Sequence, residues 1–366
     1  MIEKILRFLP IYIILSFVRY SIIIIQFPFS YIRSKITRRN IYKINDYNDR
    51  HKYILVYVGF QKKPTISCIN LLQTAKENGA YIILASNYPN VSKENFTNFC
   101  DVFLESANIG RCFSMYKMAT QYIIYNDLFK FENKKIIYAN DSVFFVKKNL
   151  SNEISKLLSN KYDLITSVEN FDEQSKYHAS SWFFSLDYNV FKSQKVNNFW
   201  NRFFEINNRF YNIRHGEVAL SKVLLKNNFK ISSSFNLENL INSEDLCIEN
   251  IRYLSTKIET DYIENRHNDV SNKNSFKNFF YLNAHTISLI QDTNLFLLKF
   301  HNFSFIKKDL FWRSNTPLQS IRLLEKILSL SNNSEYWFEI ETYFLNRERL
   351  ENRNILIKAL VFLGVR

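Results

Sequence analysis

The chain is poor in glycine, proline and cysteine. Its 366 residues include five Gly, five Pro and four Cys, whereas 46% of the residues are hydrophobic and 16% are aromatic. So few Gly and Pro exclude a collagen-like or low-complexity chain, and so much apolar surface excludes a disordered one. The apolar content is enough for one large domain or two modest ones.

The spaced cysteines and histidines of a structural zinc site are also missing. The four cysteines form no Cys-x-x-Cys pair, and the six histidines are scattered along the chain. This pattern indicates reduced thiols in a reducing compartment, the cytosol. The absence of a Gly-x-x-x-x-Gly-Lys-Ser/Thr loop argues against a P-loop kinase or ATPase. The absence of a Gly-x-Ser-x-Gly elbow argues against an α/β-hydrolase.

Acidic residues are the minority among the charged ones. The chain has 34 Asp and Glu against 48 Lys and Arg, a formal net charge of +14, and residues 1–52 hold ten basic and three acidic residues, a net +7. A basic excess can serve nucleic acid, an anionic membrane or acidic substrates such as sugar nucleotides. Because half of the excess lies in the first seventh of the chain, we expect no nucleic-acid partner.

The N-terminal segment is strongly apolar from Ile5 to Ile32. Arg19 in its middle would cost about 2.5–3.5 kcal/mol in a spanning helix, and no small-residue cleavage site of a signal peptide follows. We therefore expect residues 1–45 to form a membrane-associated helix that lies on an anionic surface. A buried helix of the globular fold is the second alternative, and a spanning helix is the third. The basic residues that follow the apolar stretch are Arg33, Lys35, Arg38, Arg39 and Lys43.

Residues 46–250 alternate between apolar strands and helices, the pattern of an α/β domain. Continuous apolar runs predict buried strands at 53–58, 81–85, 102–105 and 135–139. Further strands are expected at 162–167 and 180–186. Helices are expected at 65–78, 92–99, 111–125, 149–159, 193–209 and 217–226. Residues 251–366 are helical and aromatic in pattern, and we expect them to form a helical C-terminal lobe.

Polar residues follow the ends of the predicted strands, where α/β sheets bind ligands. The loops at Gly59, Asn87, Asn108 and Asn140–Ser142 are therefore expected to line one cleft. In Asn140-Asp141-Ser142 the Asp offers the hard oxygen ligands that Mg²⁺ or Mn²⁺ prefers. The alternative for this tripeptide is an ordinary Asx turn at a strand end.

An ordered series of short motifs runs from residue 50 to about residue 315. The motifs are the strand Tyr53–Gly59, Asn108-Ile-Gly110, Phe113-Ser-Met-Tyr116-Lys117, Asn140-Asp141-Ser142, His178-Ala-Ser-Ser181-Trp-Phe-Phe184, Phe199-Trp200, Glu217-Val-Ala-Leu-Ser221, Asn283-Ala-His285 and Phe305-Ile-Lys307-Lys-Asp-Leu310. Together they resemble the rhamnan synthesis protein F family, glycosyltransferases of bacterial O-antigen, capsule and cell-wall polysaccharide assembly. One position departs from the family pattern, because Cys112 stands where the family usually has Asp.

The resemblance implies a GT-A-like, nucleotide-sugar-binding sheet domain, with roles for the residues of these motifs. Glu217 is the candidate acceptor base, with a helix N-terminal carboxylate favoured by the macrodipole as the alternative. Asp141 is expected to bind a metal ion or the donor ribose. The alternative interpretation of Lys117 and Lys307 is that each is an ordinary surface lysine. The alternative for His178 is a structural histidine. The residues expected to hold nucleotide, phosphate or acceptor are Asn108, Gly110, Lys117, Asn140, Ser142, His178 and Lys307.

The resulting expectation is a glycosyltransferase on the inner face of the cell membrane. It would transfer a hexose, or a deoxyhexose such as rhamnose, from a nucleotide sugar to a lipid-linked saccharide, with Mg²⁺ or Mn²⁺ as the metal. The first rival is a non-catalytic, glycosyltransferase-like subunit of a polysaccharide assembly complex, which Cys112 and the absence of a true Asp-x-Asp leave open. The second rival, a basic RNA-binding protein, would need basic residues over the body of the fold.

Overall fold

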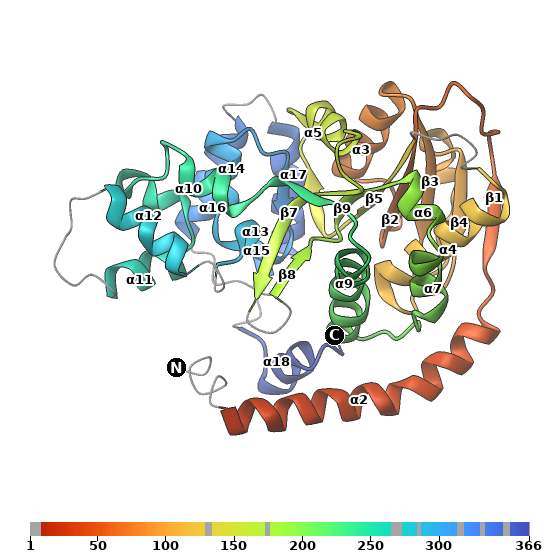
Figure 1. The fold of residues 1–366 in the computed structure, drawn as a ribbon, viewed down its shortest axis with the longest axis horizontal. Helices are drawn as coiled ribbons and strands as arrows, with labels where there is room; N and C mark the ends of the chain where they lie inside the picture. Colours follow the sequence, from red (N-terminus) through yellow and green to blue (C-terminus); the bar gives the residue numbers. More distant parts are fainter. Residues whose placement is uncertain are drawn as a thin grey trace.

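The computed structural model is described here for residues 9–128, 134–172, 176–264, 273–283, 287–312, 318–329, 334–346 and 352–365 (Figure 1). His285 of the Asn283-Ala-His285 motif lies outside these residues.

A mixed sheet forms the centre of the molecule. Its nine described strands have the order β1-β4-β3-β2-β5-β9-β7-β10, and β8 pairs with β7. β4, β3, β2 and β5 are parallel, whereas β1 and β9 are antiparallel to their neighbours. The strands are β1 (Asn40–Lys43), β2 (Tyr53–Gly59), β3 (Ala80–Ser86), β4 (Val102–Glu105), β5 (Lys135–Asn140), β7 (Leu164–Asp172), β8 (Lys176–Ala179), β9 (Phe183–Asp187) and β10 (Ile231–Phe235).

Helices cover both faces of this sheet (Figure 1). β2 alternates between them, because Leu55 and Tyr57 belong to one apolar cluster and Val56 and Val58 to the other. A strand buried on both faces is apolar without interruption, which explains why β2 was predictable. One face carries α3 (Ile66–Glu77), α5 (Leu150–Leu157) and α10 (Leu237–Asn242), and the other carries α4 (Arg111–Tyr125), α6 (Tyr188–Lys192), α7 (Gln194–Arg202), α8 (Arg209–Tyr211) and α9 (Val218–Lys226).

Some predicted helices have other bounds or another type. The helix expected at 92–99 is two 3₁₀ turns, η1 (Lys93–Asn95) and η2 (Thr97–Phe99). The helix expected at 193–209 ends at Arg202, and its remainder is a loop that leads into α8. A π-helical stretch, η3 (Asn212–Glu217), joins α8 to α9. Glu217 therefore lies inside a continuous helical segment and not at a helix N-terminus, so the macrodipole alternative for Glu217 is wrong.

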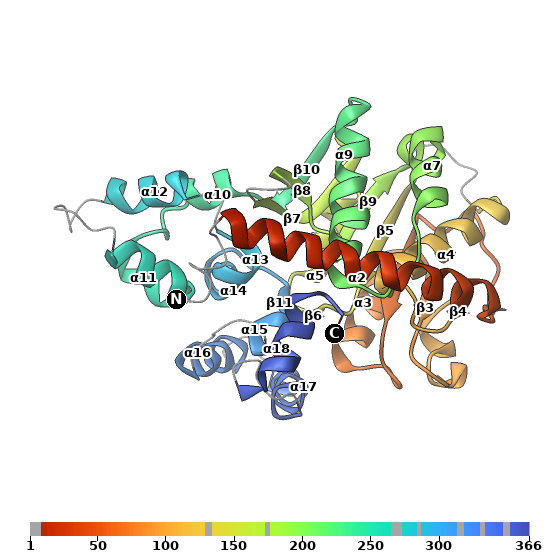
Figure 2. The ribbon, with the colours of Figure 1, turned by 90° about the horizontal axis from the view of Figure 1, so that it is seen from below.

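The N-terminal helix α2 (Leu9–Ile36) lies along one side of the molecule (Figure 2). The strand that follows it, β1, pairs with β4, so the predicted boundary at residue 45 is too late and the sheet already begins at Asn40. In the described part of the chain, no helix is long and apolar enough to cross a membrane. Arg19 faces the protein: its guanidinium lies 4.1 Å from the ring centroid of Phe362, and Nη2 donates to the Phe362 carbonyl (3.2 Å).

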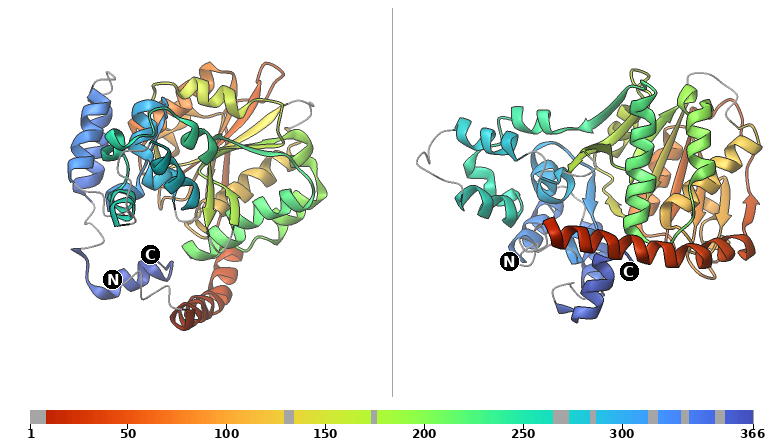
Figure 3. Two further views of the ribbon diagram at one scale, coloured as in Figure 1. Left: turned by 60° about the vertical axis from the view of Figure 1, so that its left-hand side comes forward. Right: turned by 60° about the horizontal axis from the view of Figure 1, so that its bottom comes forward.

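The C-terminal part is mostly helical but also contributes a strand. β11 (Phe305–Lys307) pairs antiparallel with β6 (Val143–Phe145) of the first part. α18 (Ile355–Phe362) reaches α2, and both helices lie at the same end of the molecule (Figure 3). The other elements are η4 (Ile248–Tyr253), α11 (Thr256–Glu264), α12 (Lys273–Leu282), α13 (Leu289–Asp292), α14 (Asn294–Phe300), α15 (Asp309–Trp312), α16 (Leu318–Ser329) and α17 (Ser334–Leu345).

Candidate active site

Four parallel strands end at the same edge of the sheet. β2, β3, β4 and β5 run in one direction, and their last residues are Gly59, Ser86, Glu105 and Asn140. Ligands of α/β sheets bind at this carboxyl edge because the loops after the strands converge there. These loops form the candidate active site.

Asp141 follows β5 and is fixed between the ends of β5 and β2. Its backbone N–H donates to the Val58 carbonyl (3.0 Å), and its Oδ2 accepts a hydrogen bond from the backbone N–H of Phe60 (2.9 Å). Within the described part of the chain, Oδ1 has no hydrogen-bond donor. One oxygen of a half-buried, positioned carboxylate is thus available to a ligand.

Asn140 points the other way, into the protein. It is 4% exposed, and its Nδ2 donates to the Tyr116 hydroxyl (3.1 Å) and to the Ser181 carbonyl (3.5 Å). Its Oδ1 accepts from the backbone N–H of Ser142 (3.0 Å), which is the Asx turn that we set out as the alternative. The amide of Asn140 holds the turn that presents Asp141, and its contacts leave it no direct role toward a nucleotide.

Lys307 reaches the same edge from a distant part of the sequence. The β6–β11 pairing aligns Lys307 with Val143, and its Nζ donates to the hydroxyl of Ser142 (3.3 Å). Burial lowers the pKa of Lys307, while the negative charges of Asp309 and Glu217 act in the opposite direction. An ammonium group that is partly removed from water attracts an anion strongly, because the local dielectric is low.

Asn87 and Asn108 lie after β3 and β4, and their side chains meet. The Nδ2 of Asn87 donates to the Oδ1 of Asn108 (3.1 Å). The Oδ1 of Asn87 is buried without a hydrogen-bond partner among the described residues. A buried acceptor of this kind costs about 1–3 kcal/mol, and a ligand N–H or O–H at this edge would satisfy it.

Two aromatic residues follow β2 and β3 at the same edge of the sheet, and sequence reasoning missed both. The rings of Phe60 and Tyr88 have centroids 5.2 Å apart, and Phe60 is 46% exposed. An exposed ring offers a stacking surface for a base, worth about 1–3 kcal/mol. The position of Phe60 directly after the strand-ending Gly59 was the signal that could have identified it.

Glu217 joins two of the sequence motifs through hydrogen bonds. Its Oε2 accepts from the backbone N–H (2.8 Å) and the hydroxyl of Ser181, and its Oε1 lies 3.2 Å from Nε2 of His178. Ser221 continues the connection, because its hydroxyl accepts from the N–H of Ala179 (3.0 Å). The motifs at 178–181 and 217–221 thus attach the α9 helix to β8 and to the loop before β9.

The charge state of Glu217 follows from these contacts. Burial alone raises the pKa of Glu217, but the hydrogen bond and charge of His178 and the two bonds from Ser181 lower it below its ordinary value. Cys112 is within electrostatic reach of both Glu217 and Asp141. Burial, followed by these two carboxylates, raises the pKa of Cys112 to about 11, so this position holds a neutral thiol.

Two predicted site residues serve packing instead. Lys117 lies on α4, where its Nζ donates to the carbonyl of Phe203 (2.8 Å) near the end of α7. Gly110 precedes α4 with a φ of +75°, and a Cβ there would lie 2.9 Å from the Cα of Glu205. The left-handed backbone and the close approach both require glycine at this position. Neither residue shows a contact with the group around Asp141.

The described residues contain no ready-made metal cage, because no three His, Cys, Asp or Glu side chains gather around one point. A cation that bridges a diphosphate needs fewer protein ligands, since one or two carboxylates suffice when phosphate and water supply the rest. Asp141, with Oδ1 available, fits that smaller requirement.

Comparisons with known proteins give distant similarities. No protein-family model matches the chain. Virulence protein VirA of Vibrio anguillarum is 26% identical over 281 residues, which cover 75% of this chain and 83% of VirA, and the protein of strain ATCC 68554 / 775 gives the same figures.

Two solved structures are similar to this chain with a TM-score of 0.29 each, too low to assign a function. One is a glycosyltransferase involved in the glycosylation of the major capsid of PBCV-1, with 10% identity over 63% of this chain and 99% of that one. The other is the mannosyltransferase PcManGT from Pyrobaculum calidifontis in complex with GDP-Man and Mn²⁺, with 8% identity over 91% of this chain and 97% of that one.

Proposed function

We propose that this chain is a glycosyltransferase of bacterial surface polysaccharide assembly, related to the rhamnan synthesis protein F family. It would move a hexose or deoxyhexose from a nucleotide sugar to a lipid-linked saccharide. The observation that carries the proposal is the convergence of Asp141 and the Lys307–Ser142 pair at the carboxyl edge of four parallel strands. A carboxylate and a cation at one edge suit the two polar parts of such a donor, the ribose and the diphosphate.

Each group at this edge has a task in donor binding. Lys307 would neutralise the charge that develops on the departing diphosphate, because its ammonium group is held by Ser142 and partly desolvated. Asp141 would accept hydrogen bonds from the ribose or hold a Mg²⁺ or Mn²⁺ ion, which would act there as a Lewis acid. Phe60 would stack on the base, and Asn87 would receive a donor group from the ligand.

For Glu217 the contacts favour a positioning role over that of the acceptor base. A general base works best with a pKa near the operating pH, whereas the pKa of Glu217 is lowered and both of its oxygens are engaged. Glu217 would hold Ser181 and His178 in place. Both oxygens of Glu217 are hydrogen-bonded, and position 112 holds a thiol instead of the family's Asp. These two features also favour the alternative hypothesis, a glycosyltransferase-like subunit that binds the donor without turnover.

A thermal-shift screen of nucleotide sugars, with and without Mn²⁺, tests donor binding because it needs no knowledge of the acceptor. We expect at least one nucleotide sugar to raise the melting temperature, and Phe60→Ala and Lys307→Gln to abolish that rise. Donor hydrolysis by the same protein then separates an enzyme from a non-catalytic subunit. If no nucleotide sugar stabilises the chain, the proposal fails.

Peripheral membrane binding through α2, on the cytoplasmic face, completes the proposal. The outward face of α2 is apolar, with Phe17 73% exposed, Ile24 69% exposed and Phe29 71% exposed. At about 100° per residue these three positions fall within an arc of roughly 140°. Exposed basic residues follow at Arg33, Lys35 and Arg38. This combination is that of a helix that lies in an anionic interface.

A further inference from the structure

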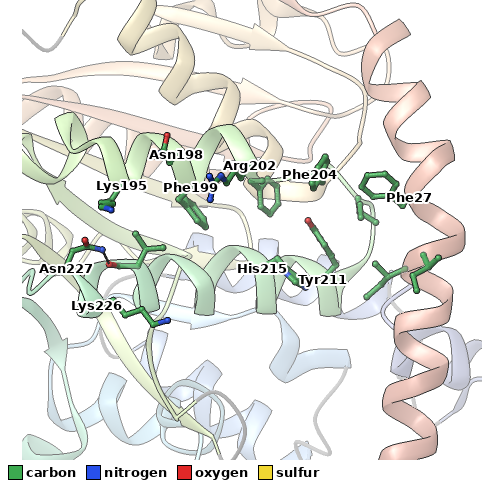
Figure 4. Close-up of a pocket in the computed structure, with 15 residues that line it drawn as sticks. Phe27, Lys195, Asn198, Phe199, Arg202, Phe204, Tyr211, His215, Lys226 and Asn227 are labelled. Atoms are coloured by element: carbon green, nitrogen blue, oxygen red, sulfur yellow. Dashed lines mark hydrogen bonds between the residues drawn. The ribbon is translucent and has the colours of Figure 1, made fainter.

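A groove of about 860 Å³ lies between α2, α7 and the helical segment Arg209–Lys226 (Figure 4). Its volume is within the roughly 300–1,000 Å³ of small-molecule sites. It is separate from the site described above, because none of the residues that line it belongs to the group around Asp141 and Lys307. No role described so far uses this groove.

The part of the groove next to α2 is apolar. Ile23 and Phe27 of α2 face Phe203, Phe204 and Ile206 of the loop after α7. Phe27 and Phe204 are in edge-to-face contact, with centroids 4.9 Å apart. Such a lining would stabilise a bound aliphatic chain by removing it from water.

The opposite part of the groove is cationic. Figure 4 shows Lys195 of α7 and Lys226 of α9 at the end away from α2, with Arg202 and His215 between that end and α2. Lys195, Arg202 and Lys226 are exposed, and no Asp or Glu lines the groove. The groove therefore changes along its length from apolar to positively charged, which complements a molecule with an aliphatic chain and an anionic head.

We propose that this groove binds one anionic phospholipid, with an acyl chain along Phe27, Phe203 and Ile206 and the phosphate between Lys195 and Lys226. The lysine side chains favour a negatively charged lipid head group. The position of α2 indicates how the lipid would enter the groove from a membrane. Ile24 both lines the groove and lies on the exposed apolar face of α2, so a chain can pass from a membrane into the groove without crossing water. The lipid site does not depend on glycosyl transfer, so the two proposals can fail separately.

Calorimetry on the full chain tests the proposal with dihexanoyl phosphatidylglycerol, kept below the concentration at which it forms micelles. We expect saturable binding of one lipid per chain. Dihexanoyl phosphatidylcholine should bind about tenfold or more weakly, because its head carries no net charge. Inorganic phosphate at the same concentration should give no signal, because it lacks the chain. Equal binding of the two lipids, or equal binding of phosphate, would overturn the proposal.

Variants locate the site. Lys195→Gln with Lys226→Gln should weaken phosphatidylglycerol binding about tenfold, whereas Lys161→Gln with Lys230→Gln removes the same charge outside the groove and should leave binding unchanged. Val223→Phe, which fills the groove, should abolish binding while melting near the parent temperature. If Val223→Phe leaves binding intact, the lipid binds elsewhere. If the parent is a dimer that binds no lipid and Val223→Phe makes it monomeric, a second copy fills the groove and the proposal is wrong.

Discussion

At the end of β5, two adjacent side chains have opposite environments. Asn140 turns inward and its amide bonds Tyr116 and Ser142, whereas Asp141 turns to the sheet edge with one oxygen bound by Phe60 N–H. The buried amide of Asn140 stabilises the turn, and the turn places the carboxylate of Asp141 at the sheet edge. If Asp141 binds the donor as proposed, substitutions at Asn140 and at Asp141 should have different effects.

Asp141→Asn should weaken nucleotide-sugar binding with little change in stability. The substituted side chain keeps an oxygen for Phe60 N–H, so the free energy of unfolding should change by no more than about 1 kcal/mol. If Asp141 holds a metal ion, the parent's donor affinity will depend on Mn²⁺ and that of the variant will not. If Asp141 contacts the ribose, the donor affinity of neither the parent nor the variant will depend on Mn²⁺. Asp49→Asn, at an exposed site, is the control. Unchanged donor binding with a much lower melting temperature would make Asp141 a structural turn residue.

Glu217→Gln should lower the melting temperature, because a glutamine amide places N–H donors against donors of Ser181 or His178. Leaving one buried donor unsatisfied costs about 1–3 kcal/mol. Since the pKa of Glu217 is lowered in the fold, its stabilisation is present above the unfolded pKa of about 4.3 and is lost as the pH falls through the folded pKa. The stability difference between parent and variant should therefore be constant near neutrality and shrink below about pH 4.

Denaturant titrations at several pH values measure this difference. A general base would behave otherwise: the variant would keep its stability at every pH and lose about 10²–10⁴-fold in turnover. That outcome would restore Glu217 as the candidate base.

At the scale of single elements, the two faces of α2 lie in different environments. Ile23 and Arg19 face the body of the protein, and Gln26 accepts a hydrogen bond from Nδ2 of Asn208 (3.3 Å). The opposite face is exposed and apolar. Because its guanidinium is held against Phe362, the central charge of Arg19 lies on the side of α2 that contacts the protein and not on its exposed apolar side.

Replacing Phe17, Ile24 and Phe29 by Ser should abolish binding to anionic vesicles while leaving the melting temperature near that of the parent. These side chains are exposed, so the fold loses little when they become polar. Flotation with vesicles that contain phosphatidylglycerol measures the binding, which should also weaken as salt is added. Phe338→Ser with Leu345→Ser removes equally exposed apolar groups from α17 and should bind as the parent does. Vesicle binding that survives the α2 changes would contradict the membrane role of this helix.

The elements that could be predicted are those whose signal is local. The strand at 53–58 is a continuous apolar run, and the helix at 111–125 follows Gly110, so both were found within a residue or two. β11 has three residues and pairs with a strand about 160 positions earlier, so no local pattern could place Lys307 beside Ser142. For the same reason the motifs located Asn140 and Lys117 on the correct elements but could not tell which way their side chains point.

At the scale of the whole molecule, the two predicted domains share one core. Phe303 and Phe305 from the C-terminal part lie against aromatic rings of the sheet domain: the centroids of Phe303 and Phe235 are 4.7 Å apart, and those of Phe305 and Trp182 are 5.0 Å apart. The hydroxyl of Ser304 donates to the carbonyl of Lys148 (2.7 Å). The C-terminal part therefore completes both the core and, through Lys307, the candidate site.

Residues 1–250 expressed alone should fail to form a stable domain. Without the C-terminal part, Trp182 and Phe235 would lose the rings of Phe305 and Phe303, and Phe183 would keep only Phe145. Each buried aromatic side chain is worth about 1.5–3 kcal/mol, a large fraction of the roughly 5–15 kcal/mol that stabilises a whole domain. We expect the full chain to unfold in one cooperative calorimetric transition, and the fragment to show none and to bind a hydrophobic dye. Co-expression with residues 251–366 should restore the transition, because the missing rings and the strand β11 return. A fragment that melts cooperatively on its own and binds a nucleotide sugar would show instead that the sheet domain is independent and that Lys307 is dispensable for the donor.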